Sequence, residues 1–266
     1  MANRIRIGAA ECINARPLLW GLREKLSKEA LVLDKPAAIA EMLRNGNLDV
    51  GLIPSIEYLR NPGYEMLPGV CVASNGPLMS VMLICRKAPA LMEKVALDTS
   101  SPSATALCRI ILQKLYSVSP EFIDWSPDIP LESVDAQGFM VAGDAALQLW
   151  PRYEHVIDLG DEWRRLTELP FVHDLWAGPA IRASVAKLLH QAKEQGMRHL
   201  SRIAWQEAER LDLPSSICLD HLVNRIHYDF GEPERQGLAR FQHYAAELDL
   251  CPSEAERTVP SVEATG

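Results

Sequence analysis

Short apolar segments alternate with amphipathic segments along the first part of the chain. Apolar runs at residues 5–10, 30–33 and 49–54 have the composition of buried strands, and the stretches that begin at Pro17, Pro36 and Ser55 have helical spacing of their apolar residues. This β-α-β-α-β order predicts an α/β fold, with a parallel sheet and helices on its faces. Because ligands bind beyond the carboxyl ends of such strands, we expect a site near residues 11–16 and 54–55.

A second α/β unit is predicted over residues 94–175. An apolar strand at residues 95–97 leads into a helix, and hydroxyl and carboxyl side chains crowd the start of that helix. A helix start has free N–H groups and the positive end of the helix dipole, so it attracts anions, and hydroxyl groups add neutral donors. The stretch therefore fits a carboxylate or phosphate site, although Ser, Thr and Asp also cap ordinary helices. Its residues are Asp98, Thr99, Ser100, Ser101 and Ser103.

The order of the elements predicts two lobes joined by two crossing segments. Residues 69–86 fit a strand, a turn and a strand that leaves the first lobe, and residues 171–181 fit a strand that returns to it. We expect residues 1–86 and 176–250 in a first lobe, residues 87–175 in a second, and a ligand cleft between them. Three helices should follow, over residues 184–211, 215–229 and 232–248, and residues 251–266 should be a disordered tail. A single doubly wound domain is the alternative.

Composition excludes several classes of function. The net charge of −8 argues against a nucleic-acid partner, because broad neutralisation of phosphates needs an excess of cations. The six cysteines have no C-x-x-C spacing, which indicates reduced thiols in the cytoplasm and neither a zinc site nor a disulfide framework. No leader pattern and no run of eighteen apolar residues is present, so we expect a cytoplasmic protein without a membrane span. The sequence makes no prediction of oligomeric state.

Six segments in order carry recognisable motifs: CINARPL at residues 12–18, LDVGLIPS at 48–55, VASNGPLMSV at 72–81, LDTSS at 97–101, AGDAAL at 142–147, and DLGDEW with LPFV and Trp176 over 158–176. Together they resemble the chorismate dehydratase family of the futalosine route to menaquinone. The resemblance covers about residues 4–180 and continues weakly to Leu248. It implies a periplasmic-binding-protein type II fold, used as a cytoplasmic enzyme.

The resemblance also implies a reaction. Chorismate, a dianion, would lose water to give 3-(1-carboxyvinyloxy)benzoate, without metal or organic cofactor. Asn14 would be catalytic by binding or orienting a proton acceptor, and the acceptor itself could be the substrate's own enolpyruvyl carboxylate or an ordered water. Serine hydroxyls and helix-start N–H groups would hold the carboxylates, and Gly76 would let backbone approach the ligand. The expected substrate-binding residues are Arg16, Ser55, Ser74, Gly76, Ser80, Thr99, Ser100, Ser101, Ser103, Thr105, Gly143, Asp144 and Trp176.

The chain departs from the family pattern at several positions near the expected pocket. Cys12 replaces a tyrosine, Ser103-Ala104 replaces Thr-Ser after Pro102, Glu168 replaces a glycine, and His173-Asp174 replaces Phe-Ala. These changes leave room for a divergent specificity. The imidazole of His173 could do acid–base work or be structural, and Trp163 and Trp176 could wall the cleft or fill the core.

Two other functions compete with this one. The first is 1,4-dihydroxy-6-naphthoate synthase, which has the same fold and acts later in the same route, but its early Ser-Pro-Cys-Pro-Asn type of motif is absent from this chain. The second is a non-catalytic cytoplasmic protein that binds an organic anion.

Overall fold

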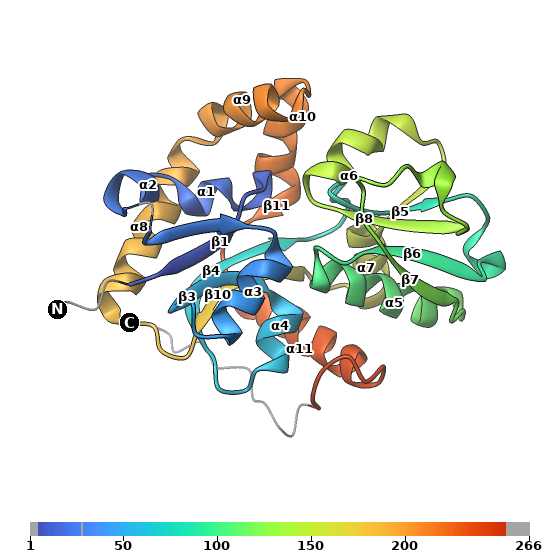
Figure 1. Cartoon of the computed structure of the whole chain (residues 1–266), viewed down its shortest axis with the longest axis horizontal. Helices are drawn as coiled ribbons and strands as arrows, with labels where there is room; N and C mark the ends of the chain where they lie inside the picture. Colours follow the sequence, from blue (N-terminus) through green and yellow to red (C-terminus); the bar gives the residue numbers. More distant parts are fainter. Residues whose placement is uncertain (1–4, 28, 254–266) are drawn as a thin grey trace.

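The first of two lobes is built on a six-stranded sheet. The computed structural model describes residues 5–27 and 29–253, and it places the two lobes side by side (Figure 1). The strand order of the first sheet is β11-β4-β10-β3-β1-β2, with β1 parallel to β2 and β3, and with β10 antiparallel to β3 and β4. Its strands are β1 (Ile7–Ala10), β2 (Leu31–Asp34), β3 (Val50–Pro54), β4 (Glu65–Ser74), β10 (Phe171–Gly178) and β11 (Ile226–His227).

The second lobe is built on a five-stranded sheet of order β7-β6-β8-β5-β9. Its central strand pairs are parallel, β6 with β7 and with β8, whereas β5 runs antiparallel to β8 and β9. The strands are β5 (Val81–Cys85), β6 (Lys94–Asp98), β7 (Glu121–Trp125), β8 (Gly138–Ala142) and β9 (Val156–Asp158). The helices are α5 (Pro102–Tyr116), α6 (Asp144–Leu149) and α7 (Leu159–Thr167), with single 3-10 turns at Pro89–Leu91, Leu131–Ser133 and Trp150–Arg152. The predicted α/β class is confirmed in both lobes.

Helices cover the first sheet, and two of them differ from the predictions. They are η1 (Ile13–Ala15), α1 (Arg16–Leu19), α2 (Leu22–Lys25), α3 (Pro36–Arg44), α4 (Ser55–Arg60), α8 (Ala183–Arg198), α9 (Leu200–Leu211), α10 (Ser215–Asp220) and α11 (Glu232–Ala246). The single helix expected over residues 184–211 is broken at His199, whose ring stacks on Trp20 at 4.8 Å. The helix expected over 215–229 ends early. A π-helical turn, His221–Arg225, follows α10, because the chain then pairs with β4 as the edge strand β11.

The chain changes sheets between Ser74 and Val81, and again between Asp158 and Phe171. Strand β5 therefore belongs to the second sheet although it precedes residue 86, and β10 begins in the first sheet before residue 176. We propose these crossings as the lobe limits in place of residues 86 and 176. The tail predicted over residues 251–266 lies outside the described residues from residue 254 onward.

One carboxylate joins the two crossing segments. Asp158 accepts hydrogen bonds from the N–H groups of Leu78 at 2.8 Å and Met79 at 2.6 Å in the first crossing. Its other oxygen accepts from Gly160 at 2.9 Å and Asp161 at 3.1 Å, so Asp158 caps α7. The crossing segments are therefore fastened to each other at one point.

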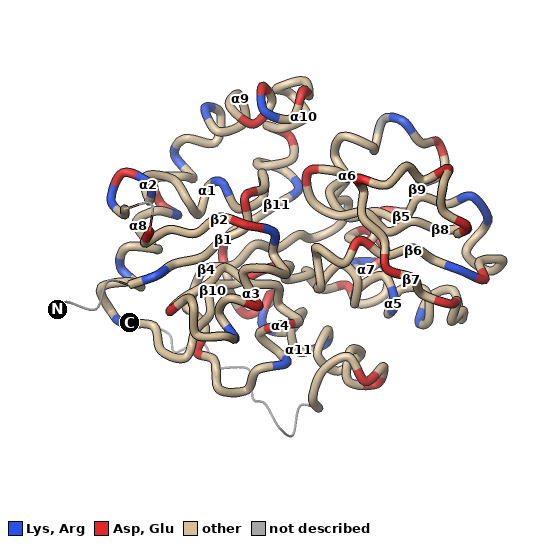
Figure 2. Tube along the Cα trace, in the orientation of Figure 1, with Lys and Arg blue, Asp and Glu red and all other residues tan. Residues whose placement is uncertain are grey.

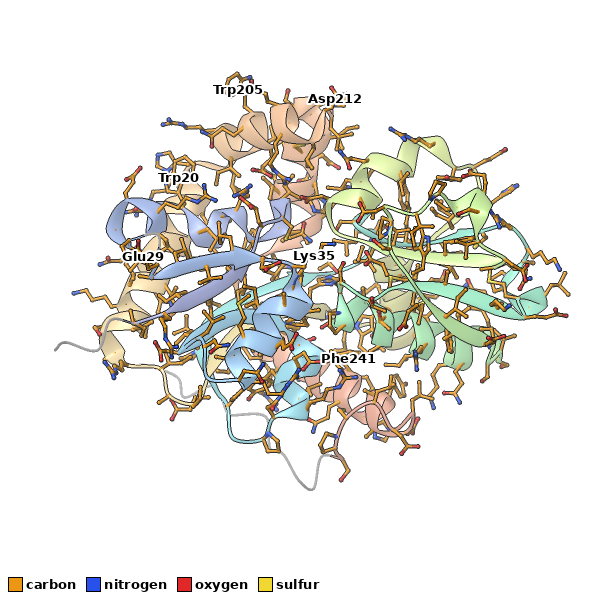
Figure 3. All side chains as sticks on the ribbon, in the orientation of Figure 1. Trp20, Glu29, Lys35, Trp205, Asp212 and Phe241 are labelled. Carbon is orange, nitrogen blue, oxygen red and sulfur yellow. The ribbon has the colours of Figure 1, made fainter. Side chains whose placement is uncertain are left out.

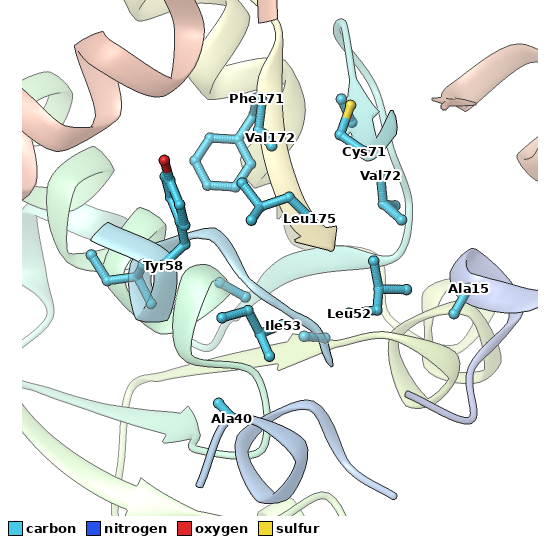
Figure 4. Packing of buried hydrophobic residues seen from close by; sticks show 14 of the residues in the cluster. Ala15, Ala40, Leu52, Ile53, Tyr58, Cys71, Val72, Phe171, Val172 and Leu175 are labelled. Atoms are coloured by element: carbon cyan, nitrogen blue, oxygen red, sulfur yellow. The ribbon is translucent and has the colours of Figure 1, made fainter. Parts of the chain in front are cut away.

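The main cluster of buried apolar residues includes side chains of both lobes, and the second lobe has a smaller cluster of its own. Figure 4 shows side chains of β3 and β10 packed together, among them Leu52, Ile53 and Phe171. Trp163 packs edge-on against Phe171 and donates its indole N–H to the carbonyl of Pro170 at 3.1 Å. Trp176 is fully buried in the same cluster. Both tryptophans therefore belong to the core and not to a cleft wall. Within the part of the chain that is described, no helix is long and apolar enough to cross a membrane.

Candidate active site

A cleft of about 450 Å³ lies where the carboxyl ends of strands from both sheets meet. The first-lobe wall consists of residues that follow β1 and β2, together with two residues of β10. The second-lobe wall consists of residues that follow β6, β7 and β8. The cleft thus lies where parallel strands are expected to place a ligand. Its lining includes Glu11, Cys12, Asn14, Asp34, Lys35, Asp98, Ser100, Ser101, Asp128, Gly143, Asp144, His173 and Asp174.

Hydrogen bonds span the cleft from lobe to lobe. The Asp144 carboxylate, at the start of α6, accepts from the Ile13 N–H at 3.0 Å and from the Arg210 guanidinium at 2.7 Å. The N–H of Ala37, in the first turn of α3, donates to the carbonyl of Ser100 at 3.2 Å. The lobes are therefore held together from two sides. Asp144 lines the cleft but serves to connect the lobes.

Asn14 is fixed by two buried neighbours. His221 Nε2 lies 2.6 Å from Asn14 Oδ1, and Asn14 Nδ2 lies 3.4 Å from Ser80 Oγ. Because an amide oxygen only accepts, the imidazole carries its proton on Nε2. Burial lowers the pKa of His221 to about 4, so the ring is neutral at pH 7. One N–H of the Asn14 amide remains for a ligand.

Some of the hydroxyl groups at the start of α5 face the cleft, and one faces the interior. Ser100 and Ser101 line the cleft, and the Ser100 hydroxyl donates to Asp98 Oδ1 at 2.6 Å. Ser103 points inward, where its hydroxyl donates to the His173 carbonyl at 3.0 Å and lies 3.1 Å from the Ser55 hydroxyl. The Ser103 and Ser55 hydroxyls therefore join α5 and α4 to β10 and are not available to a ligand.

Of the expected site residues, five line the cleft: Asn14, Ser100, Ser101, Gly143 and Asp144. The others are placed elsewhere: Arg16, Ser55, Ser74, Gly76, Ser80, Thr99, Ser103, Thr105 and Trp176. Arg16 does not line the cleft and pairs with Glu207 of α9 at 2.7 Å and with Glu11 at 3.5 Å. The Ser80 hydroxyl accepts a hydrogen bond from the Asn14 amide at 3.4 Å, and the Thr105 hydroxyl donates to the carbonyl of Asp98 at 3.2 Å. His221 is not among the expected site residues, because no motif marks the π-helical turn that carries it.

His173 and Asp174 both line the cleft because β10 contains a bulge between Val172 and Asp174. Consecutive strand residues normally face opposite sides, and a bulge changes the direction of one of them. His173 Nε2 lies 2.9 Å from the Ser74 hydroxyl, and burial lowers the pKa of His173 to about 3. His173 is therefore a neutral, hydrogen-bonded ring, which favours its structural role. Burial raises the pKa of Asp174 to about 7.

The charged groups that line the cleft are mostly acidic. Lys35 is the cation of the lining, at the start of α3, and Figure 3 shows it between the lobes. Elsewhere, acidic and basic residues are interspersed over both lobes (Figure 2). An anionic ligand would consequently depend on Lys35, serine hydroxyls and backbone N–H groups.

A family model described as menaquinone biosynthesis matches residues 5–247. The chain belongs to this family. A relative named chorismate dehydratase, from Thermus thermophilus, is 29% identical over 257 residues, which cover 88% of this chain and 93% of that protein. The family assignment and the resemblance of the six motifs therefore agree.

Solved structures show the fold of this family member. A protein from Archaeoglobus fulgidus matches with a TM-score of 0.70 and 13% identity over 94% of this chain and all of that one. The alkanesulfonate-binding protein of Xanthomonas axonopodis pv. citri matches with a TM-score of 0.69 and 16% identity, over 94% of each chain. The periplasmic aliphatic sulphonate binding protein of Escherichia coli matches with a TM-score of 0.63 and 16% identity over 98% of this chain and 94% of that one. The predicted periplasmic-binding-protein-like fold is confirmed.

Proposed function

We propose that the protein is a chorismate dehydratase, a lyase that removes water from chorismate to give 3-(1-carboxyvinyloxy)benzoate. The observation that carries the proposal is the cleft of this menaquinone-family chain, in which Asn14 faces the start of α5 across the gap between the lobes. The relative named chorismate dehydratase, matched over 93% of its length, supports the same reaction.

The reaction suits the groups that the cleft offers. The hydrogen on the ether-bearing ring carbon is conjugated through a ring alkene to a carboxylate, and the ring becomes aromatic when water leaves. The protein must hold two carboxylates, orient the ring and assist proton transfer, and it needs no strong nucleophile. Lys35, the Ser101 hydroxyl, and the first-turn N–H groups of α5 are suited to the carboxylates.

Asn14 would orient the reacting part of the ring. Its amide has one free N–H, and its two neighbours, His221 and Ser80, hold it in a single orientation. An oriented donor stabilises charge that develops on an oxygen during reaction, without reorganisation. Independence of metal and organic cofactors, binding of a small molecule alone, and a cytoplasmic location remain predictions that accompany this function.

Purified protein incubated with chorismate tests the proposal. We expect chorismate to disappear with formation of an equal amount of 3-(1-carboxyvinyloxy)benzoate, measured by liquid chromatography and mass spectrometry. Chelator-treated protein should retain its rate. Saturable binding of chorismate without turnover, measured by calorimetry, would instead favour a non-catalytic protein that binds organic anions.

A further inference from the structure

Asp174 differs from the other carboxylates that line the cleft, because it has no hydrogen-bond or ion-pair partner among the described residues. The other carboxylates each accept a hydrogen bond: Glu11 from Arg23, Asp34 from the Lys35 N–H, Asp98 from Ser100, Asp128 from Ser126, and Asp144 from Ile13 and Arg210. A carboxyl group that is partly buried without a partner is costly when ionised. Such a group in a cleft is a candidate for proton transfer.

The backbone places Asp174 at the cleft. The bulge at residues 172–174 lets His173 and Asp174 both line it, and bulges of this kind are frequent beside active sites. The carbonyl of His173 is held by Ser103, and its ring by Ser74. The backbone before Asp174 is therefore fixed to both lobes, and it places Asp174 on the same wall as Asn14.

We propose that Asp174 is the general acid of the dehydration, donating its carboxyl proton to the ring hydroxyl as that hydroxyl leaves. The inference rests on the proposed function. The ring C–H bond breaks, and its proton passes to the enolpyruvyl carboxylate or to a water. Its electron pair forms the new ring double bond while the C–O bond to the hydroxyl breaks. The hydroxyl takes the Asp174 proton and departs as water. The proton on the acceptor returns to Asp174 through solvent, so the protein is unchanged and one water is lost.

The charge of the substrate suits a neutral carboxyl at this position. Burial already raises the pKa of Asp174 to about 7, and a bound dianion disfavours the ionised form further. Asp174 would therefore be protonated in the complex, when the leaving hydroxyl needs a donor. A protonated carboxyl also avoids repulsion of the substrate in a cleft whose lining is mostly acidic.

The neighbouring groups are less suitable donors. The neutral ring of His173 is engaged with Ser74. Burial and the nearby Asp144 and Asp174 carboxylates raise the pKa of the Cys12 thiol, which makes it a weak acid. The remaining titratable groups of the lining are Glu11, Asp34, Lys35, Asp98, Asp128 and Asp144.

The test compares Asp174→Asn with Asp135→Asn in the chorismate assay. Asparagine keeps the shape and a neutral donor but has no transferable proton, so we expect kcat to fall by about 10²–10⁴-fold while KM changes little. Asp135→Asn removes an exposed acidic side chain of the second lobe that does not line the cleft, and its kcat should stay within about threefold of the wild type. A kcat of Asp174→Asn within threefold of the wild type would overturn the inference and leave the proposed function standing.

The pH dependence separates an acid from a structural side chain. Wild-type kcat/KM should fall about tenfold per pH unit above about pH 7, because the required form of Asp174 is protonated. This decline should be absent from Asp174→Asn. A decline that persists in the variant assigns it to another group and contradicts the inference. Wild-type protein that does not convert chorismate would overturn both the inference and the proposed function.

Discussion

The two walls of the cleft differ in the kind of group that they present. The first-lobe wall carries side chains whose position or protonation is set by buried neighbours: Asn14 between His221 and Ser80, and Asp174 beside the bulge of β10. The second-lobe wall carries the starts of α5 and α6, with the Ser101 hydroxyl and backbone N–H groups. The difference suggests that the first lobe performs the chemistry, and that the second lobe, together with Lys35 of the first, holds the anionic groups of the ligand. Variants on each wall can test this division.

Beyond the Asp174 variant, the largest expected effect is that of Asn14→Ala on the first wall. Loss of one oriented donor should lower kcat by about 10²–10³-fold, while the dissociation constant of chorismate, measured by calorimetry, stays within about threefold. Asn224→Ala, at an exposed asparagine that bonds only Asp220 in the described structure, is the matched control. Full activity of Asn14→Ala would remove Asn14 from the chemistry.

The next effect concerns stability and depends on pH. The folded-state pKa of Asp174, about 7, exceeds the unfolded value near 3.9. The contribution of Asp174 to the free energy of unfolding is therefore fully present below about pH 4, and it is lost as pH rises to 7. Because Asp174 is only partly buried, we discount this loss to about 2 kcal/mol. Asp174→Asn should therefore unfold at higher denaturant concentration than the wild type at pH 8, and the two should differ little at pH 4. Equal midpoints at pH 8 would show that the Asp174 carboxylate costs no stability.

A smaller effect is expected when the support of Asn14 is removed. His221→Ala frees the Asn14 amide from its 2.6 Å contact, and we expect kcat to fall about tenfold because the donor is no longer held in one orientation. His221→Gln, which can restore a donor to Asn14 Oδ1, should recover part of the rate. His243→Ala, at an exposed histidine, serves as the control. An unchanged kcat in His221→Ala would indicate that His221 does not position Asn14. Failure of His221→Gln to recover any rate, with native stability in both variants, would indicate the same.

The smallest effect belongs to the second wall. Ser101→Ala removes one hydroxyl that lines the cleft, and we expect KM for chorismate to rise about threefold, because one neutral hydrogen bond contributes about 1 kcal/mol or less. The value of kcat should stay within about twofold, and Ser133→Ala, at an exposed serine, should change neither constant. A change confined to kcat would reverse the assignment of roles to the two walls.

The position of the cleft could be predicted from the sequence because parallel strands impose it. Asn14, Ser101 and Asp144 each follow closely after a strand of apolar residues, and the carboxyl ends of parallel strands meet at one edge of a sheet. The short motifs that carry these residues are local, so their register with the strands is visible without the fold. The lobes and their α/β layers follow from the same periodicity.

The exact partners could not be predicted, because they depend on contacts between distant segments. Ser103 follows Ser101 by two positions, yet packing of α5 against α4 and β10 turns its hydroxyl inward. Arg16 forms an ion pair with Glu207, which is almost two hundred residues away in the chain. His221 forms its hydrogen bond with Asn14 from a comparable separation. Side-chain direction at such positions is decided by tertiary packing, which periodicity does not record. The bulge of β10 likewise depends on its pairing with β4, and no local pattern predicts it.

The bridges between the lobes have a consequence for the timing of turnover. With the Ile13 N–H and Arg210 both bound to Asp144, and the Ala37 N–H bound to Ser100, these contacts must break before the two lobes can separate. Both crossing segments are fastened to Asp158, so they have to move together when the lobes separate. An aromatising reaction is strongly downhill and does not return to chorismate. If the product leaves only when the lobes separate, the rate of that separation sets an upper limit on the catalytic rate.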